Sequence, residues 1–165
     1  MSQQLRIRLA TPADADTIAW HRARMFQDMG EVPANLFEPF RAESWEQIYQ
    51  MLVRGEYIGW LASPEDDEEI VGGAGVQLRR VLPHPLINAN GEITVAKGRH
   101  AIVLNVFTEP DWRRRGIAEL LIKRIIDWSR EEHLDSLVLH ASDEARALYE
   151  RLGFVATNEM RFAGE

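Results

Sequence analysis

The clearest chemical signal in the sequence is a run of three arginines, residues 113–115, followed directly by Gly116. It lies between an apolar segment over residues 101–107, which predicts a buried strand, and an amphipathic segment that predicts a helix ending near residue 132. The first amides of a helix lack acceptors within the helix and carry partial positive charge, so they attract anions. Gly116 has no side chain to obstruct a ligand that approaches the backbone. The segment therefore predicts a pyrophosphate site, with a solvated basic turn as the alternative.

Two better-known phosphate-binding loops do not match the sequence. The Walker A loop requires Gly-Lys followed by Ser or Thr, and the chain has no such triplet. The dinucleotide fingerprint requires three spaced glycines between a strand and a helix. Gly72, Gly73 and Gly75 lie inside a predicted strand with no helix after it. We interpret them as positions where the backbone packs closely against its neighbours.

The arginine segment resembles a known family signature. Arg113-x-x-Gly116-x-Ala118 after a strand is similar to the coenzyme A signature of the GNAT acetyltransferase superfamily, Gln/Arg-x-x-Gly-x-Gly/Ala. Residues 145–154, ALYERLGF with the preceding Ala-Arg, are similar to the second signature of that family, a helix that carries Leu-Tyr and ends in Gly-Phe. The two blocks follow in the family's order over residues 101–162. The first hundred residues match the family in pattern only.

The resemblance implies acetyl-CoA as the cofactor. It implies that backbone groups of Val106 and Thr108 pair with the pantetheine arm as an added strand, since the predicted strand splays from its parallel neighbour. It also implies that the amides at the start of the helix surround the pyrophosphate, with Arg113 beside it. The residues expected to bind the cofactor are Val106, Phe107, Thr108, Arg113, Arg114, Arg115, Gly116, Ile117, Ala118 and Ser142.

The same resemblance implies a catalytic role for Tyr149, which would protonate the leaving thiolate. A tyrosine that only packs in the core is the alternative. The candidate general base is His100, because Ile102 and Leu104 on the same strand face cannot accept a proton. The alternative, which we favour, is that His100 only lies at the exposed start of the strand. Asn105 points to the other face, where it is expected to bind substrate or to cap a backbone group.

Other positions bear on the cofactor and the acceptor. Many relatives have Asn where this chain has Ser142, and serine is an equally good helix cap, so a coenzyme contact there is not required. Substrate specificity is expected from the first helices and the loop over residues 81–98. Asp28, Glu31 and Glu92 are candidate carboxylates for a cationic amine, with ordinary surface charge as the alternative for each.

The periodicity along the chain predicts the elements that position these residues. Helices are expected over 12–29, 41–53, 110–132 and 142–152; strands over 5–9, 57–62, 70–78, 101–107, 136–140, 155–157 and 160–162. The loop over 81–98 is expected to be irregular, with a short hairpin at Asn90-Gly91. The expected fold class is α/β (α+β), and the resemblance implies that it is the GNAT acyl-CoA N-acyltransferase fold. It has a mixed central sheet of six to seven strands with about four helices, in the order β-α-α-β-β-β-α-β-α-β-β.

The composition limits the classes of function. The 165 residues suit one domain, an N-acetyltransferase domain over residues 1–165 by the resemblance, and the formal charge of −7 disfavours a nucleic-acid-binding protein. There is no cysteine, no metal-ligand spacing, no signal peptide and no apolar run of membrane-spanning length. We therefore expect a cytoplasmic protein with no metal site and no nucleic-acid or membrane partner. Homodimerisation is compatible with such a fold.

Three functions remain open from the sequence. The leading one is an N-acetyltransferase that uses acetyl-CoA and acts on a primary amine of a small molecule or peptide. The second is a non-catalytic acyl-CoA binding or sensing module on the same fold, because no base is evident on the strand. The third is nucleic-acid contact through the arginine run, which the net charge of −7 opposes.

Overall fold

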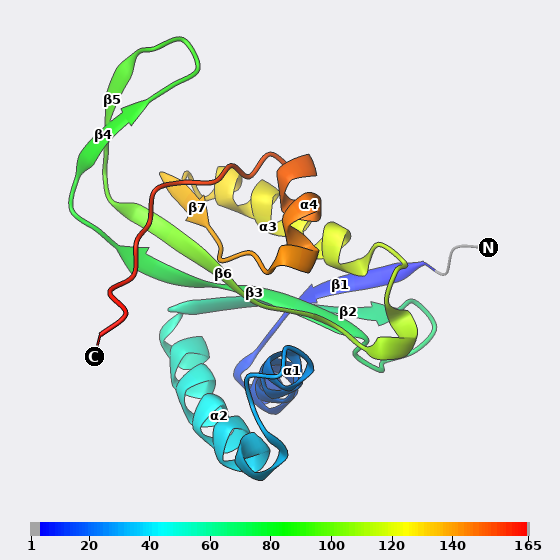
Figure 1. Ribbon diagram of the computed structural model, residues 1–165. Helices are drawn as coiled ribbons and strands as arrows, with labels where there is room; N and C mark the ends of the chain where they lie inside the picture. Colours follow the sequence, from blue (N-terminus) through cyan, green and yellow to red (C-terminus); the bar gives the residue numbers. More distant parts are fainter. Residues whose placement is uncertain (1–3, 165) are drawn as a thin grey trace.

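The structure, a computed structural model, describes residues 4–164. The strands in chain order are β1 (Leu5–Leu9), β2 (Tyr57–Pro64), β3 (Gly72–Arg80), β4 (His84–Ile87), β5 (Ile93–Ala96), β6 (Arg99–Thr108) and β7 (Ser136–Val138). The α-helices in these residues are α1 (Ala15–Asp28), α2 (Phe37–Arg54), α3 (Ile117–Glu131) and α4 (Asp143–Arg151). Helices α1 and α2 cover one face of the sheet, and α3 and α4 cover the other (Figure 1). The fold class and the four helices expected from the sequence are confirmed.

The main sheet is mixed and has the strand order β1-β2-β3-β6-β7. Strands β1, β2, β3 and β6 pair antiparallel with their neighbours, and β6 and β7 form the expected parallel pair. The β6–β7 pairing covers only His100 to Ile102 on β6. Beyond Ile102, the edge of β6 that faces β7 has no strand partner in the described residues, so its backbone groups are free for a ligand.

The fold has three layers, with the sheet between two layers of helices (Figure 1), because both faces of the sheet are apolar. Strand β2 is buried along almost its whole length, because α2 and α3 cover its two faces. One cluster of buried side chains joins the sheet to α3 through Trp60, Val76, Leu121 and Ile125. A second cluster joins the sheet to α1 and α2. Strand β6 contributes Ala101 and Val103 to the first cluster, and α1 also packs against this strand.

The glycines of β3 lie where neighbouring atoms leave no room for a side chain, as the sequence predicts. A Cβ on Gly72 would lie 2.9 Å from the Ile117 side chain, and a Cβ on Gly75 would collide with the Tyr57 hydroxyl. Gly72 thus lets α3 pack close to the sheet, and Gly75 lets the Tyr57 side chain lie across β3. This is packing and not a nucleotide-binding loop.

Residues 81–98 are more regular than the sequence predicts, because they form the β4–β5 hairpin. The expected turn at Asn90-Gly91 joins two paired strands, which form a separate two-stranded sheet. Figure 1 shows this hairpin projecting away from the rest of the molecule. The main sheet therefore has five strands and not the expected six to seven, because β4 and β5 pair only with each other and residues 154–164 add no strand.

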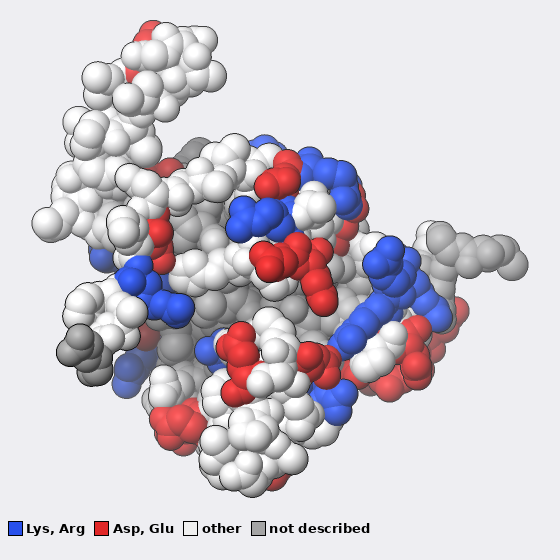
Figure 2. All heavy atoms as spheres, in the orientation of Figure 1, with Lys and Arg blue, Asp and Glu red and all other residues white. Residues whose placement is uncertain are grey.

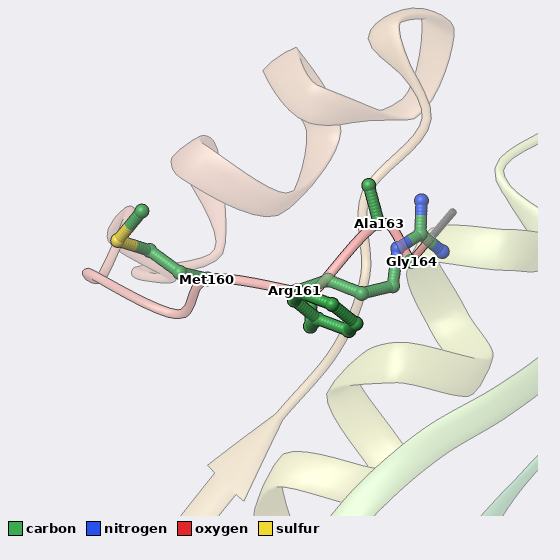
Figure 3. A pocket seen from close by; sticks show the side chains of 5 residues that line it. Met160, Arg161, Ala163 and Gly164 are labelled. Atoms are coloured by element: carbon green, nitrogen blue, oxygen red, sulfur yellow. The ribbon is translucent and has the colours of Figure 1, made fainter.

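The two closing strands expected over 155–157 and 160–162 are wrong. Residues 154–164 form no helix or strand, and Val155, Met160 and Phe162 are 81%, 93% and 92% exposed. A strand needs a free sheet edge, and β7 offers only three residues. Figure 3 shows the open hollow that this segment makes with itself, lined by the five consecutive residues 160–164. It includes none of the expected site residues.

Candidate functional site

The turn between β6 and α3 presents a row of free amides, as expected from the sequence. A short 3-10 turn at Pro110–Trp112 uses the amides of Trp112 and Arg113, which donate to Glu109 and Pro110. The amides of residues 114–118 have no acceptor within the described residues. Gly116 has a φ of 82°, in the left-handed region, and open space lies where its Cβ would be. The turn thus offers unengaged N–H groups to an anion.

The arginine side chains at this turn differ in what they contact. Arg113 donates to Asp28 at 2.6 Å and to the Thr108 carbonyl at 3.0 Å, so its charge is already paired. Arg115 lies over the Trp112 ring at 4.8 Å. Figure 2 shows basic side chains gathered over this turn, with acidic ones beside them. The charge available to an anion therefore comes mainly from Arg114 and Arg115.

A β-bulge in β6 begins three residues after Ile102, the last residue of β6 that pairs with β7. The β3–β6 register shifts between Gly73 and Gly75, so Asn105 and Val106 have no partner residue on β3. Asn105 has a φ of 58°, a left-handed conformation that asparagine tolerates better than most residues. Bulges redirect side chains and end strand pairing, and they often lie beside active sites. Val106, Phe107 and Thr108, expected to bind the cofactor, follow this bulge directly.

The second signature helix is α4, which carries Tyr149. Tyr149 is 8% exposed and packs in the core cluster that includes α3, with its ring centroid 5.9 Å from that of Phe154. Burial raises the pKa of its phenol, so the side chain stays protonated at neutral pH. Ser142 caps α4, and its hydroxyl accepts from the amide of Ala145.

A cavity of about 230 Å³ lies against α2, on the face of the sheet opposite α3 and α4 (Figure 1). It reaches the bulge at Leu104 and Asn105. Its lining residues come from α1, α2, β2, β3 and β6: Arg22, Phe40, Glu43, Ser44, Gln47, Ile48, Met51, Tyr57, Gln77, Leu104 and Asn105. The bulge therefore lies between the cavity and the unpaired edge of β6, and the turn with the free amides follows at the end of that strand.

Residues 17–154 match the Acetyltransferase (GNAT) family, which covers most of the chain. The chain belongs to the GNAT family. The resemblance inferred from residues 113–118 and 145–154 is thereby confirmed. No curated protein gives a significant match to this GNAT chain in sequence.

Several solved structures share the fold of this chain. A GCN5-related N-acetyltransferase from Ralstonia eutropha JMP134 has a TM-score of 0.81 and 25% identity, covering 98% of this chain and 100% of that one. A predicted acetyltransferase from Clostridium acetobutylicum, solved with acetyl-CoA, has a TM-score of 0.78 and 22% identity, covering 98% and 96%. An aminoglycoside acetyltransferase from a soil metagenomic sample has a TM-score of 0.63 and 17% identity, covering 98% and 95%. The last two show the fold alone.

The candidate base of this GNAT domain lies far along β6 from the bulge. His100 is at the start of the strand, five residues before Asn105, which corresponds to about 16 Å of extended chain. Its ring packs edge-on against His84, and its buried Nε2 has no hydrogen-bond partner in the described residues. The structure therefore places His100 at the start of β6, as the sequence favours, but half-buried and not exposed, and it does not bring His100 to the bulge.

None of the three candidate acceptor carboxylates lines the cavity. Asp28 pairs with Arg113 and Arg24, and Glu92 accepts from Asn88 in the β4–β5 hairpin. Glu31 follows the end of α1. The carboxylate that does line the cavity is Glu43, on α2. The sequence could not indicate it, because Glu43 is one of several acidic residues on the exposed side of that helix.

Arg22 and Tyr57 are the main cavity residues that the sequence analysis did not identify. Arg22 follows Ile18 by four residues and precedes Phe26 by four, so a charged residue interrupts an otherwise apolar helix face. That interruption was the available signal. The sequence contained no comparable signal for Tyr57, because tyrosine is common in strands.

His21 lies beneath the strand that carries the expected cofactor residues. It is 2% exposed, and its ring centroid is 4.9 Å from that of Phe107. Its Nε2 is 3.8 Å from Glu109, yet burial dominates and lowers the pKa of His21 to about 4. Burial also raises the pKa of Glu109. His21 is therefore neutral at pH 7 and supports Phe107 by packing.

The buried His21 predicts a loss of stability in acid. Between pH 6.5 and 4, the unfolded chain binds a proton on this residue that the folded chain does not, so the free energy of unfolding falls as the pH falls. The full contribution is about 3 kcal/mol. Urea unfolding from pH 7 to pH 4 should show a steeper decline for the wild type than for His21→Gln. Parallel profiles, or an imidazole that titrates near 6.5 by NMR, would contradict this.

Two further observations concern the described residues as a whole. No helix in residues 4–164 combines the length and the apolar character needed to cross a membrane. In the same part of the chain, no group of three or more His, Asp or Glu side chains is arranged to hold a metal ion.

Proposed function

We propose that the protein transfers the acetyl group of acetyl-CoA to a primary amine of a small molecule or peptide, by direct attack in a ternary complex. The observation that carries this proposal is the combination of free amides at residues 114–118 with the unpaired edge of β6 beyond Ile102. Helix-start amides bind phosphate groups, and a free strand edge binds an extended polar chain. Coenzyme A contains both groups in succession.

The residues at the turn fit the cofactor. The amides of residues 114–118 would hold the pyrophosphate, with the charges of Arg114 and Arg115 beside them. Backbone groups of Val106 and Thr108 would hold the pantetheine arm, although the Thr108 carbonyl also accepts from Arg113. When bound, acetyl-CoA supplies a thioester whose acetyl group a neutral amine can attack.

Two groups of this chain would act at the reacting atoms. The Val106 amide, which lies on the bulge, is our candidate donor of a hydrogen bond to the acyl oxygen. Tyr149 is our candidate acid, because its buried phenol is protonated and can donate at the departing sulfur. The proposed reaction has no covalent intermediate on cysteine, since the chain contains no cysteine.

A non-catalytic acyl-CoA binding module is the second candidate function. The observation that favours it is the absence of an ionisable side chain on β6 beside the bulge, where Ile102 and Leu104 share a strand face and His100 is distant. The cavity of about 230 Å³ on the other face of β6 favours the enzyme, because a sensor needs no second site.

Release of coenzyme A in the presence of amines distinguishes the two functions. We expect free thiol to form from acetyl-CoA at a rate that depends on both the protein and a primary amine, and calorimetry to show coenzyme A binding. Coenzyme A binding without thiol release on any small-molecule or peptide amine would favour the sensor. Absence of coenzyme A binding would contradict both functions.

A further inference from the structure

The cavity behind the bulge is lined by one cation, the half-buried Arg22 of α1. Its Nη1 donates to the side-chain oxygen of Asn105 at 2.8 Å. Its guanidinium lies over the rings of Phe26 at 4.9 Å and Phe40 at 5.9 Å. These contacts hold the guanidinium at one position against the cavity wall.

The charge of Arg22 has no carboxylate partner. Within residues 4–164, no Asp or Glu oxygen lies within 4.0 Å of it, whereas Arg8, Arg41 and Arg113 each have such a partner. Arg22 is half-buried, and burial lowers its pKa, which reflects the cost of removing an unpaired cation from water. An anion bound in the cavity would offset that cost.

A purely structural role accounts for only part of this arrangement. Arginine has five N–H donors, and one of them serves Asn105. The Asn105 amide in turn donates to the Tyr57 hydroxyl at 3.0 Å, so the network fixes the bulge through Asn105. No other hydrogen bond from the Arg22 guanidinium to the described residues is found. Its remaining donors are free for a planar, two-oxygen ligand.

The charges of the cavity identify the kind of anion. Glu43 also lines the cavity and lies at its exposed side, while Arg22 is its one cationic lining residue. One cation and one anion suit a ligand that carries one carboxylate and one ammonium group. A phosphate dianion would leave an excess of negative charge beside Glu43.

We propose that Arg22 binds the carboxylate of the acceptor, so that the acceptor is a small amine that also bears a carboxylate, of the amino acid type. This inference rests on the proposed function, because it assigns the cavity to the acceptor. The volume of about 230 Å³ limits the ligand to a small molecule or the end of a peptide.

The test compares L-amino acids with their own carboxamides. For alanine, methionine and phenylalanine, we expect kcat/KM with acetyl-CoA to exceed that of the matching carboxamide by about 10- to 100-fold, the effect of a charge-assisted hydrogen-bonded pair. In Arg22→Gln this ratio should fall to about one, mainly through KM, and in Arg22→Lys it should be intermediate. The carboxamides have the less basic amines, so intrinsic reactivity opposes the expected order.

Two controls separate this inference from the proposed function. Arg54→Gln, on the exposed end of α2, removes one positive charge from the same helical layer without touching the cavity, and should keep the wild-type ratio. Calorimetry of the same ligands in the presence of coenzyme A measures the preference without turnover. Equal binding of acids and carboxamides, stronger binding of phosphate-bearing amines, or an Arg22→Gln protein that folds and keeps the preference would overturn the inference. Failure of every amine to release coenzyme A would overturn the proposed function and the acceptor role with it, whereas a calorimetric preference for acids over carboxamides that Arg22→Gln abolishes would still show carboxylate binding at Arg22.

Discussion

Replacement of Gly116 by glutamate should weaken coenzyme A binding by about 100-fold or more. The new carboxylate would project beside the free amides of residues 114–118, where the pyrophosphate is expected. Two negative charges about 4 Å apart repel by about 4 kcal/mol near a protein surface. The left-handed φ of 82° adds backbone strain for any residue with a Cβ. Calorimetric titration of coenzyme A into each variant measures the effect.

Gly91 provides a matched control for this substitution. It has a φ of 78° and open space around its Cβ position, and it lies in the β4–β5 turn, away from α3. Gly91→Glu therefore introduces the same charge and similar strain without approaching the β6–α3 turn, and should leave coenzyme A affinity unchanged. Gly116→Ala isolates the strain from the charge. Equal affinity in wild type and Gly116→Glu would remove the basis for a phosphate site at this turn.

Local sequence signals were sufficient to predict the geometry of the proposed coenzyme A site. A buried strand, an arginine turn, a left-handed glycine and an amphipathic helix follow one another within about thirty residues, so their geometry depends on neighbouring residues. The free amides of residues 114–118 were therefore predictable. The short parallel pairing of β6 with β7 was predictable in kind, because a strand, a helix and a strand in succession form a right-handed crossover.

The cavity proposed for the acceptor depends on contacts that no local pattern contains. Arg22 and Asn105 are 83 residues apart, and only the packing of α1 against the bulge brings them together. The bulge itself shifts the alternation of β6 by one residue, so face assignments along the strand change after Leu104. The prediction of strands over 155–157 and 160–162 was wrong for a similar reason. Alternating apolar residues do not show whether the sheet has a free edge with which such a strand could pair.

Replacement of Tyr149 by phenylalanine should lower kcat by about 100-fold with little change in the KM for acetyl-CoA. Loss of a positioned general acid costs a factor of about 10² or more. The Tyr149 hydroxyl has no hydrogen-bond partner in the described residues, and its ring packs with Phe154, so the variant should retain the wild-type fold. Steady-state rates of thiol release at saturating amine measure the effect.

The protonation state of Tyr149 makes the prediction specific to its hydroxyl. Burial raises the pKa of this phenol above its ordinary value of 10, so the proton is present throughout the range from pH 6 to 9. The ratio of wild-type to Tyr149→Phe rates should therefore stay constant across that range. Tyr49→Phe, which removes a hydroxyl from the exposed face of α2, should leave the rate unchanged. A Tyr149→Phe enzyme with the wild-type maximal rate would show that the side chain only packs in the core, and the departing sulfur would then take its proton from solvent.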